Sequence, residues 1–565
     1  MVRLLKLAAI VAALVALVVV AGRWRTQSPA PGDDMLVASA RTEPASYNRY
    51  VEGSAATELV SLLTDATLVR VNRSTDVVEP ALAESWTQSP DGLTYTLKLR
   101  RDVRFSDGAP FTAADVLFTA RVLYDPQVAS PVASSMRIDG KPLALAAPDD
   151  FTVTVTLPAP FAPGLRLLDQ MPILPRHKLE TPFTEDRFRE SWRSGTPFTE
   201  LARLGPFMLT EHVAGQRLVF TRNPHFWRTD DEGERLPYLD RLVVAIIADQ
   251  NTEALRLAAG EIDLMANGDI RPEDYATFKR ASEDGRLHLI EVGIGLDPNM
   301  LWFNLSDAPG ARAPWLGDRR VRQAISYAVD RQAMVDTVYL GAAVPIYGPV
   351  SPGNRTWASS TVPQYVHDPA RARTLLSSAG LRDPDGDGML DDAAGKPVRF
   401  SIITQRGNTP RERSAAVIQE HLRQVGIAVD VVALDSDSLV TRWAAGDYDS
   451  IFFGVQASST DPAMNSDFWL SSGAYHFWNP GQEAPATQWE ARIDELMVRQ
   501  AAAPTLAERQ ELFAEVQRII GEELPVIYFA APRVTLAVSP RVQNPTPVLQ
   551  LPQLLWSAET LSVSR

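Results

Sequence analysis

The sequence predicts an α/β protein on three observations. A strand, a helix and a second strand follow one another within residues 398–434, two stretches further upstream alternate apolar and polar side chains, and several amphipathic helices begin at capping residues. The apolar share of 45% and the charged share of 22% suit a folded soluble protein, and 565 residues are enough for several domains.

The N-terminus is typical of an exported protein. An uncharged, mostly apolar stretch over residues 7–22 follows a basic start and is itself followed by Arg23 and Arg25. It is slightly shorter than the ~20 residues of a membrane-spanning helix. Residues 1–34 are therefore predicted to be a signal peptide or, as the alternative, a membrane anchor plus linker. The body of the protein is predicted to be periplasmic or otherwise extracytoplasmic.

Two strands with a period of two are expected in the first third of the chain. Residues 93–100 and 151–157 each place apolar side chains on one face and polar side chains on the other. Such strands fit a half-exposed antiparallel sheet, so residues 65–194 are predicted to be rich in antiparallel strands.

Helices are expected where a capping residue precedes a helical apolar pattern. Thr112 and Asp115 resemble a capping box, and Thr505 with Glu508 forms a better one. Asp318 is placed to cap a helix that runs to residue 340.

The region after residue 398 predicts a βαβ unit. Strands are expected at 398–404 and 427–434, with a helix between them, and a third strand is expected at 448–455. Because a helix connects them, the first two strands are expected to be parallel, with a right-handed crossover. Ligands of open α/β sheets bind beyond the carboxyl ends of such strands, which points to residues 405–408 and 456–461.

Composition excludes several classes of function. The net charge of −14 argues against a nucleic-acid partner, and the absence of cysteine removes disulfides, thiolate metal ligands and thiol nucleophiles. The sequence contains no Gly-x-Ser-x-Gly elbow, no phosphate-binding loop and no His-Glu-x-x-His pair. Nothing in the sequence therefore identifies a catalytic residue, and we expect a protein that is not an enzyme.

An acidic segment resembles the start of a calcium loop. Asp383, Asp385 and Asp387 occupy the first, third and fifth positions, and Gly388 occupies the sixth. The twelfth position, which should be a bidentate Glu, is Ala394. We interpret the segment as a polar turn and predict no metal site.

Several ordered segments resemble one family, the extracytoplasmic solute-binding proteins of ATP-driven importers, family 5, which includes peptide-, oligopeptide- and nickel-binding proteins. The segments that carry the resemblance extend over most of the body and are residues 79–86, 91–95, 103–116, 205–207, 222–227, 260–263, 320–330 and 443–449.

The resemblance implies a two-lobed periplasmic-binding-protein-like fold (type II), with an extra strand-rich domain inserted in the first lobe. Lobe I would comprise residues 35–64, 195–300 and 501–565, and the inserted domain would be residues 65–194. Lobe II would be residues 301–500. The family binds without reacting, so no cofactor is expected, and the protein is expected to act as a monomer.

The resemblance also implies ligand-binding residues. In peptide-binding relatives an Arg after the first strand of the βαβ unit holds the ligand carboxylate, and Arg406 stands at that place. An Asp that binds the ligand amine in those relatives is replaced by Ser458. The expected ligand-binding residues are therefore Arg406, Gly454, Gln456, Ser458 and, as a replacement acid, Asp461.

The expected function is that of a receptor that binds a peptide-like solute between two lobes and delivers it to an importer permease in the membrane. Two alternatives remain open. The solute could be an oligosaccharide, an opine-like conjugate or a metal chelate, or the protein could be a secreted hydrolase, which would turn its ligand over.

Overall fold

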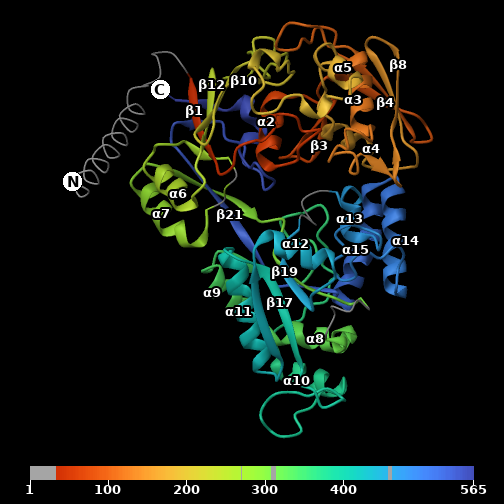
Figure 1. The fold of residues 1–565 in the computed structure, drawn as a ribbon. Helices are drawn as coiled ribbons and strands as arrows, with labels where there is room; N and C mark the ends of the chain where they lie inside the picture. The colour runs from red at the N-terminus through yellow and green to blue at the C-terminus, as the bar shows by residue number, and fades with distance from the viewer. Residues whose placement is uncertain (1–33, 267, 269, 307–312, 456–460, 565) are drawn as a thin grey trace, which may run out of the picture.

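The computed structural model describes residues 34–266, 268, 270–306, 313–455 and 461–564, and it has two lobes joined at a waist (Figure 1). Each lobe is built around its own mixed sheet, with helices packed against the sheets. The predicted α/β, two-lobed fold is therefore confirmed.

The sheet of lobe I contains both parallel and antiparallel strands. Its order is β10-β11-β12-β1-β13-β21-β14, where β1 is parallel to β12 and β13, and β21 is antiparallel to β13 and β14. Apolar cores lie on both faces of this sheet. The elements are β1 (Met35–Ala40), α2 (Ala55–Thr64), β10 (Phe207–Val213), β11 (Arg217–Arg222), β12 (Arg241–Ile246), α6 (Gln250–Ala258), β13 (Leu264–Met265), α7 (Tyr275–Glu283), β14 (His288–Ile294), β21 (Ala530–Val538), β22 (Val542–Gln543) and β23 (Ser562–Val563).

A separate set of elements between α2 and β10 carries its own four-stranded antiparallel sheet, in the order β4-β5-β9-β8. The strands β5 and β9 are those predicted from the period of two, and their polar faces are partly exposed as expected. The elements are β2 (Val69–Asn72), β3 (Val77–Pro80), β4 (Ala83–Gln88), β5 (Thr94–Leu99), α3 (Ala113–Tyr124), β6 (Arg137–Ile138), β7 (Lys141–Pro142), β8 (Ala144–Asp149), β9 (Thr152–Thr156), α4 (Gly164–Leu167) and α5 (Arg176–Thr184).

Lobe II contains the predicted βαβ unit. Its sheet has the order β18-β17-β19-β15-β20, in which β17 is parallel to β18 and β19. Apolar cores lie on both faces, because alternate residues of β15 point to opposite sides. The elements are β15 (Met300–Phe303), α8 (Arg319–Ala328), α9 (Arg331–Val338), β16 (Ala343–Pro345), α10 (Pro369–Ser378), β17 (Arg399–Gln405), α11 (Thr409–Arg423), β18 (Ala428–Leu434), α12 (Ser436–Ala444), β19 (Ser450–Phe453), α13 (Ser466–Trp469), α14 (Gln488–Ala502), α15 (Leu506–Glu523) and β20 (Val526–Tyr528).

The two sheets are joined by two short crossings of the chain. Residues 295–299 connect β14 to β15, and Phe529 connects β20 to β21. The strand β16 pairs with residues 530–532 of β21, directly after the second crossing, and so holds this part of the chain in place. Both crossings are short, so they form a narrow connection about which the lobes can rotate.

A fully buried cation lies beside the second crossing. Arg331 donates hydrogen bonds from its Nε to the carbonyls of Ile346 and Tyr528, both at 3.0 Å. Its two Nη atoms donate to the carbonyls of Ser326 and Tyr365 and to the Ser326 hydroxyl, at 2.9–3.0 Å. Burial lowers the pKa of Arg331 to about 10, so the side chain remains charged at neutral pH.

The structure differs from the prediction at one domain boundary. The helix α15 contributes Phe513, Val516 and Ile520 to the core of lobe II, and β20 is an edge strand of the lobe II sheet. The chain therefore returns to lobe I at Phe529, later than the predicted position after residue 500. The apolar pattern of α15 predicts that one face of the helix is buried, but it does not indicate whether that face packs in lobe I or in lobe II.

The helix predicted from Asp318 to residue 340 is divided in two. The helix α8 ends before Val329, and Asp330 caps α9 by accepting hydrogen bonds from the backbone N–H groups of Gln332 and Ala333. A second capping residue within the apolar pattern explains the break.

In the part of the chain that the structure describes, no helix combines the length and the apolar character needed to cross a membrane. The predicted signal peptide or anchor lies outside the described residues, except for its last residue, Asp34.

Candidate functional site

The carboxyl edge of the lobe II sheet is where the ligand-binding residues are expected. Arg406 directly follows β17, and its backbone N–H donates to the carbonyl of Leu434 at 2.7 Å. Its side chain is exposed, with one Nη2 hydrogen bond of 3.0 Å to the carbonyl of Ala433. Most of the guanidinium donors of Arg406 therefore remain available to a ligand.

A second arginine lies at this edge, and no sequence motif predicts it. Arg411, in the first turn of α11, donates to Asn299 Oδ1 at 2.7 Å and to Gln405 Oε1 at 2.6 Å. Its guanidinium stacks over the Phe453 ring at 3.9 Å. Burial lowers the pKa of Arg411 to about 10. Because Asn299 belongs to the first crossing, Arg411 ties the edge of the lobe II sheet to the connection between the lobes.

Gly454 lies against the same crossing. A Cβ atom on this residue would be 2.9 Å from Asn299 Oδ1 and 3.3 Å from the carbonyl of Pro298. The close approach of the two chain segments explains the glycine and brings the end of β19 beside the connection between the lobes.

Asp461 is buried in an ion pair with Arg509. Both carboxylate oxygens accept hydrogen bonds from the guanidinium, at 2.5 and 2.7 Å, and Oδ1 also accepts from the backbone N–H of Ala463. Arg509 is further held by the carbonyl and the side-chain oxygen of Gln500. The carboxylate of Asp461 is thus occupied within the protein, and its role as a replacement for the missing acid stays a prediction. Gln456 and Ser458 lie outside the described residues.

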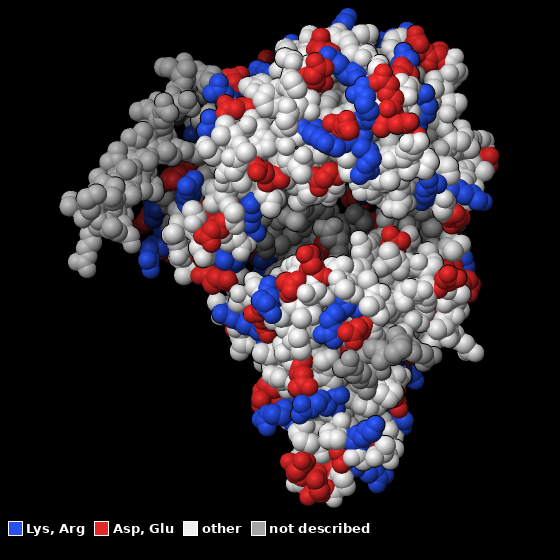
Figure 2. Space-filling view, in the orientation of Figure 1, with Lys and Arg blue, Asp and Glu red and all other residues white. Residues whose placement is uncertain are grey.

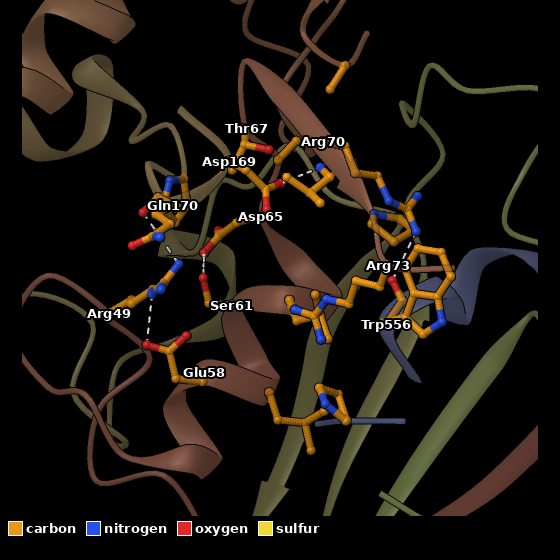
Figure 3. A pocket seen from close by; sticks show the side chains of 18 of the residues that line it. Arg49, Glu58, Ser61, Asp65, Thr67, Arg70, Arg73, Asp169, Gln170 and Trp556 are labelled. Carbon is orange, nitrogen blue, oxygen red and sulfur yellow. Dashed lines mark hydrogen bonds and ion pairs between the residues drawn. The ribbon is translucent and has the colours of Figure 1, made fainter. Parts of the chain in front are cut away.

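A pocket of about 750 Å³ is lined by residues of lobe I and of the elements between α2 and β10, away from the residues predicted from the motif (Figure 3). The helix α2, the strand β2 and the C-terminal segment around Trp556 form its walls. Its charged lining residues are Arg41, Arg49, Glu58, Asp65, Arg70, Arg73, Asp169, Arg228 and Glu559. No sequence pattern predicts this pocket, because its walls come from segments that are far apart in the chain and share no motif.

The acidic segment forms a turn at the exposed end of lobe II. The carboxylates of Asp383, Asp385 and Asp387 each offer an oxygen within 4.8 Å of the others. Asp383 accepts hydrogen bonds from the backbone N–H groups of Gly386 and Gly388, as in a polar turn. No carboxylate stands at residue 394 to close a calcium site.

Comparisons with known proteins agree on one family. The sequence model of the bacterial extracellular solute-binding proteins, family 5 (middle region), matches residues 77–477. A probable ABC transporter-binding protein of Deinococcus radiodurans is 27% identical, and the match covers 86% of this chain and 85% of the relative. The oligopeptide-binding protein AppA of Bacillus subtilis is 28% identical over 91% of this chain and 89% of the relative.

Solved structures share the fold. The structure of AppA from Bacillus subtilis in complex with a nonapeptide superposes with a TM-score of 0.71 at 24% identity, covering 94% of this chain and 99% of that one. This similarity supports the two-lobed architecture.

Breaking the Asp461–Arg509 pair should destabilise the protein. In the Asp461→Asn variant, Arg509 stays buried without its counter-charge, which typically costs ~3–5 kcal/mol. We expect a clear fall in the thermal midpoint measured by differential scanning calorimetry. The control is Asp430→Asn, whose pair with Arg399 is exposed and should change the midpoint little. Equal midpoints for the two variants would contradict the structural role of Asp461.

Calcium should have little effect on stability. The twelfth-position ligand is missing, so millimolar calcium is expected to leave the thermal midpoint almost unchanged. A large increase that EDTA reverses, and that Asp383→Asn abolishes, would show that the turn at residues 383–391 is a calcium site.

Proposed function

Since the chain belongs to the bacterial extracellular solute-binding proteins of family 5, we propose that it is the receptor of an ATP-driven importer and binds a peptide-like solute between its two lobes. The observation that carries this proposal is the pair of short crossings, at residues 295–299 and Phe529, between two independently packed sheets. The surface is recessed between the two lobes (Figure 2).

Binding and signalling follow from this geometry. A solute that contacts both lobes makes all its contacts only when the lobes are closed, so it shifts the population toward the closed state. The permease then distinguishes the loaded receptor from the empty one by its shape. A receptor releases its solute chemically unchanged, whereas a secreted hydrolase would cleave it.

Arg406 is the proposed contact between lobe II and an anionic group of the solute. Its exposed guanidinium stands at the carboxyl end of β17, next to the end of β18, on the same edge of the sheet as Arg411 and Gly454. The main chain at Gly454 is the second proposed contact, and Gln456 and Ser458 complete the proposed set, because the carboxylate of Asp461 is already paired with Arg509.

The proposed location is outside the cytoplasmic membrane, as the family description implies. We propose that residues 1–34 direct export and are then removed, and that the receptor works as a monomer. The proposed partners are the permease subunits of the importer.

Closure can be measured with the solute that the protein itself carries. Solute released from denatured protein is identified by mass spectrometry and added back to solute-free protein. Small-angle scattering should then show a smaller radius of gyration at saturation. An unchanged radius, with binding demonstrated by calorimetry, would contradict closure of the lobes.

Removing the guanidinium of Arg406 should weaken binding of an anionic solute. Loss of one partner of a desolvated charge pair typically costs ~2–5 kcal/mol, so Arg406→Ala should bind at least tenfold more weakly in calorimetry. Arg406→Lys should restore binding only in part, because lysine cannot form the two-pronged contact. The control is Arg399→Ala, an exposed arginine at the opposite end of the same strand. Wild-type affinity in Arg406→Ala would identify Arg406 as a surface charge.

A further inference from the structure

The two lobes also meet at a place away from the two crossings. The backbone N–H of Ala162, in the loop between β9 and α4, donates a hydrogen bond to the carbonyl of Ala501 in α14, with 2.6 Å between the two atoms. Met464, also in lobe II, packs against the apolar core that the lobe I sheet shares with the elements between α2 and β10. In Figure 1 the end of α14 reaches these elements on the other side of the waist from β21.

The loop that carries Ala162 is held rigidly. Three of the six residues 158–163 are proline, which restricts the backbone dihedral angles of this loop. The carbonyl of Phe161 accepts from the backbone N–H of Gly164 at 2.9 Å, and the Phe161 ring packs against the same apolar core. A Cβ atom on Gly164 would be only 2.6 Å from the Leu157 Cδ1 atom, so the start of α4 packs closely on this core. The N–H group of Ala162 is therefore fixed in its direction.

The acceptor in lobe II is a helix-terminal carbonyl. Ala501 lies in the last turn of α14, where the backbone carbonyls have no partner within the helix. The Nε atom of Arg509 binds the neighbouring carbonyl, that of Gln500, at 3.0 Å. The carbonyl of Ala501 receives its hydrogen bond from Ala162, and thus from the other lobe.

The buried ion pair of lobe II positions the second part of the contact as well. Asp461 pairs with Arg509 and accepts a hydrogen bond from the backbone N–H of Ala463, at the start of the short helix Pro462–Asn465. This short helix carries Met464. Both lobe II groups that touch the other lobe therefore depend on the same buried pair.

We propose that Ala162, Ala501 and Met464 form a latch that stabilises the closed arrangement of the two lobes. Its two sides belong to different lobes, so rotation about the crossings that opens the lobes has to separate them. The inference rests on the proposed rotation of the lobes, and it adds that closure is stabilised by the protein itself in addition to the solute.

A latch of this kind regulates how long the receptor keeps its solute. The contacts of the latch raise the closed fraction, and the solute can leave only after they break. The permease then has to replace or break these contacts to obtain the solute. The hydrogen bond joins two backbone groups and Met464 is apolar, so salt outside the cell has little effect on the latch.

The test measures the distance between the lobes with spin labels. The chain has no cysteine, so two introduced cysteines are the only groups that a thiol-reactive label modifies. Ala146→Cys on β8 and Ser377→Cys on α10 are exposed positions on the two sides of the waist. The full-length protein is freed of solute by denaturation and refolded, and double electron–electron resonance gives the distribution of label distances.

Two variants open the latch by different means. Met464→Glu places a carboxylate against an apolar core, so the ratio of open to closed molecules should rise at least about tenfold. Ala162→Pro removes only the N–H donor and should raise this ratio about fivefold. The control is Val498→Glu, which adds the same charge to α14 at a side chain that is 60% exposed, and its distances should match those of the wild type. Thermal midpoints verify that each variant is folded.

The outcomes separate the latch from the receptor function. Wild-type distances in folded Met464→Glu and Ala162→Pro overturn the latch, and so does an equal change in Val498→Glu. If scattering shows contraction on addition of the released solute while these variants keep wild-type distances, the latch is wrong and the receptor function stands. If both variants open but the released solute causes no contraction, the latch is supported and closure by the solute is contradicted.

Discussion

The buried guanidinium of Arg331 is the interaction on which the arrangement of the two lobes depends. It donates to backbone carbonyls of α8, of Ile346 directly after β16, of Tyr365 before α10, and of Tyr528, the last residue of β20. Without it, these carbonyls would be buried without donors, which is costly. Arg331 therefore fixes the point at which the chain leaves the lobe II sheet and enters β21.

The first crossing is held in a different way. Asn299 meets Arg411 and the main chain at Gly454, both of which belong to the carboxyl edge of the lobe II sheet. Under the proposed function, a solute at this edge would lie close to the residues that hold the first crossing.

Local sequence patterns predicted where helices and strands form better than they predicted which of these elements pack together. The strands β5, β9, β17 and β18 were predictable because burial of one face imposes a period on the sequence, and caps predicted the starts of α3, α8 and α15. The ion pair between Asp461 and Arg509 could not be predicted, because it depends on where α15 packs. The pocket in lobe I was also beyond prediction, since Arg73 and Asp169 come from separate elements that only the tertiary fold brings together.

The position of β21 has a consequence for the order in which the chain folds. All five strands of the lobe II sheet come from one continuous stretch, residues 300–528, whereas β21 is an interior strand of the lobe I sheet and is contributed by residues 530–538. A chain that emerges from a translocation channel N-terminus first can complete lobe II before lobe I. The strand β1 finds both of its neighbours, β12 and β13, by residue 265, but β14 joins the lobe I sheet only through β21. The lobe I sheet is therefore completed last, and its unfinished edge at β13 is the part most dependent on protection against aggregation during export.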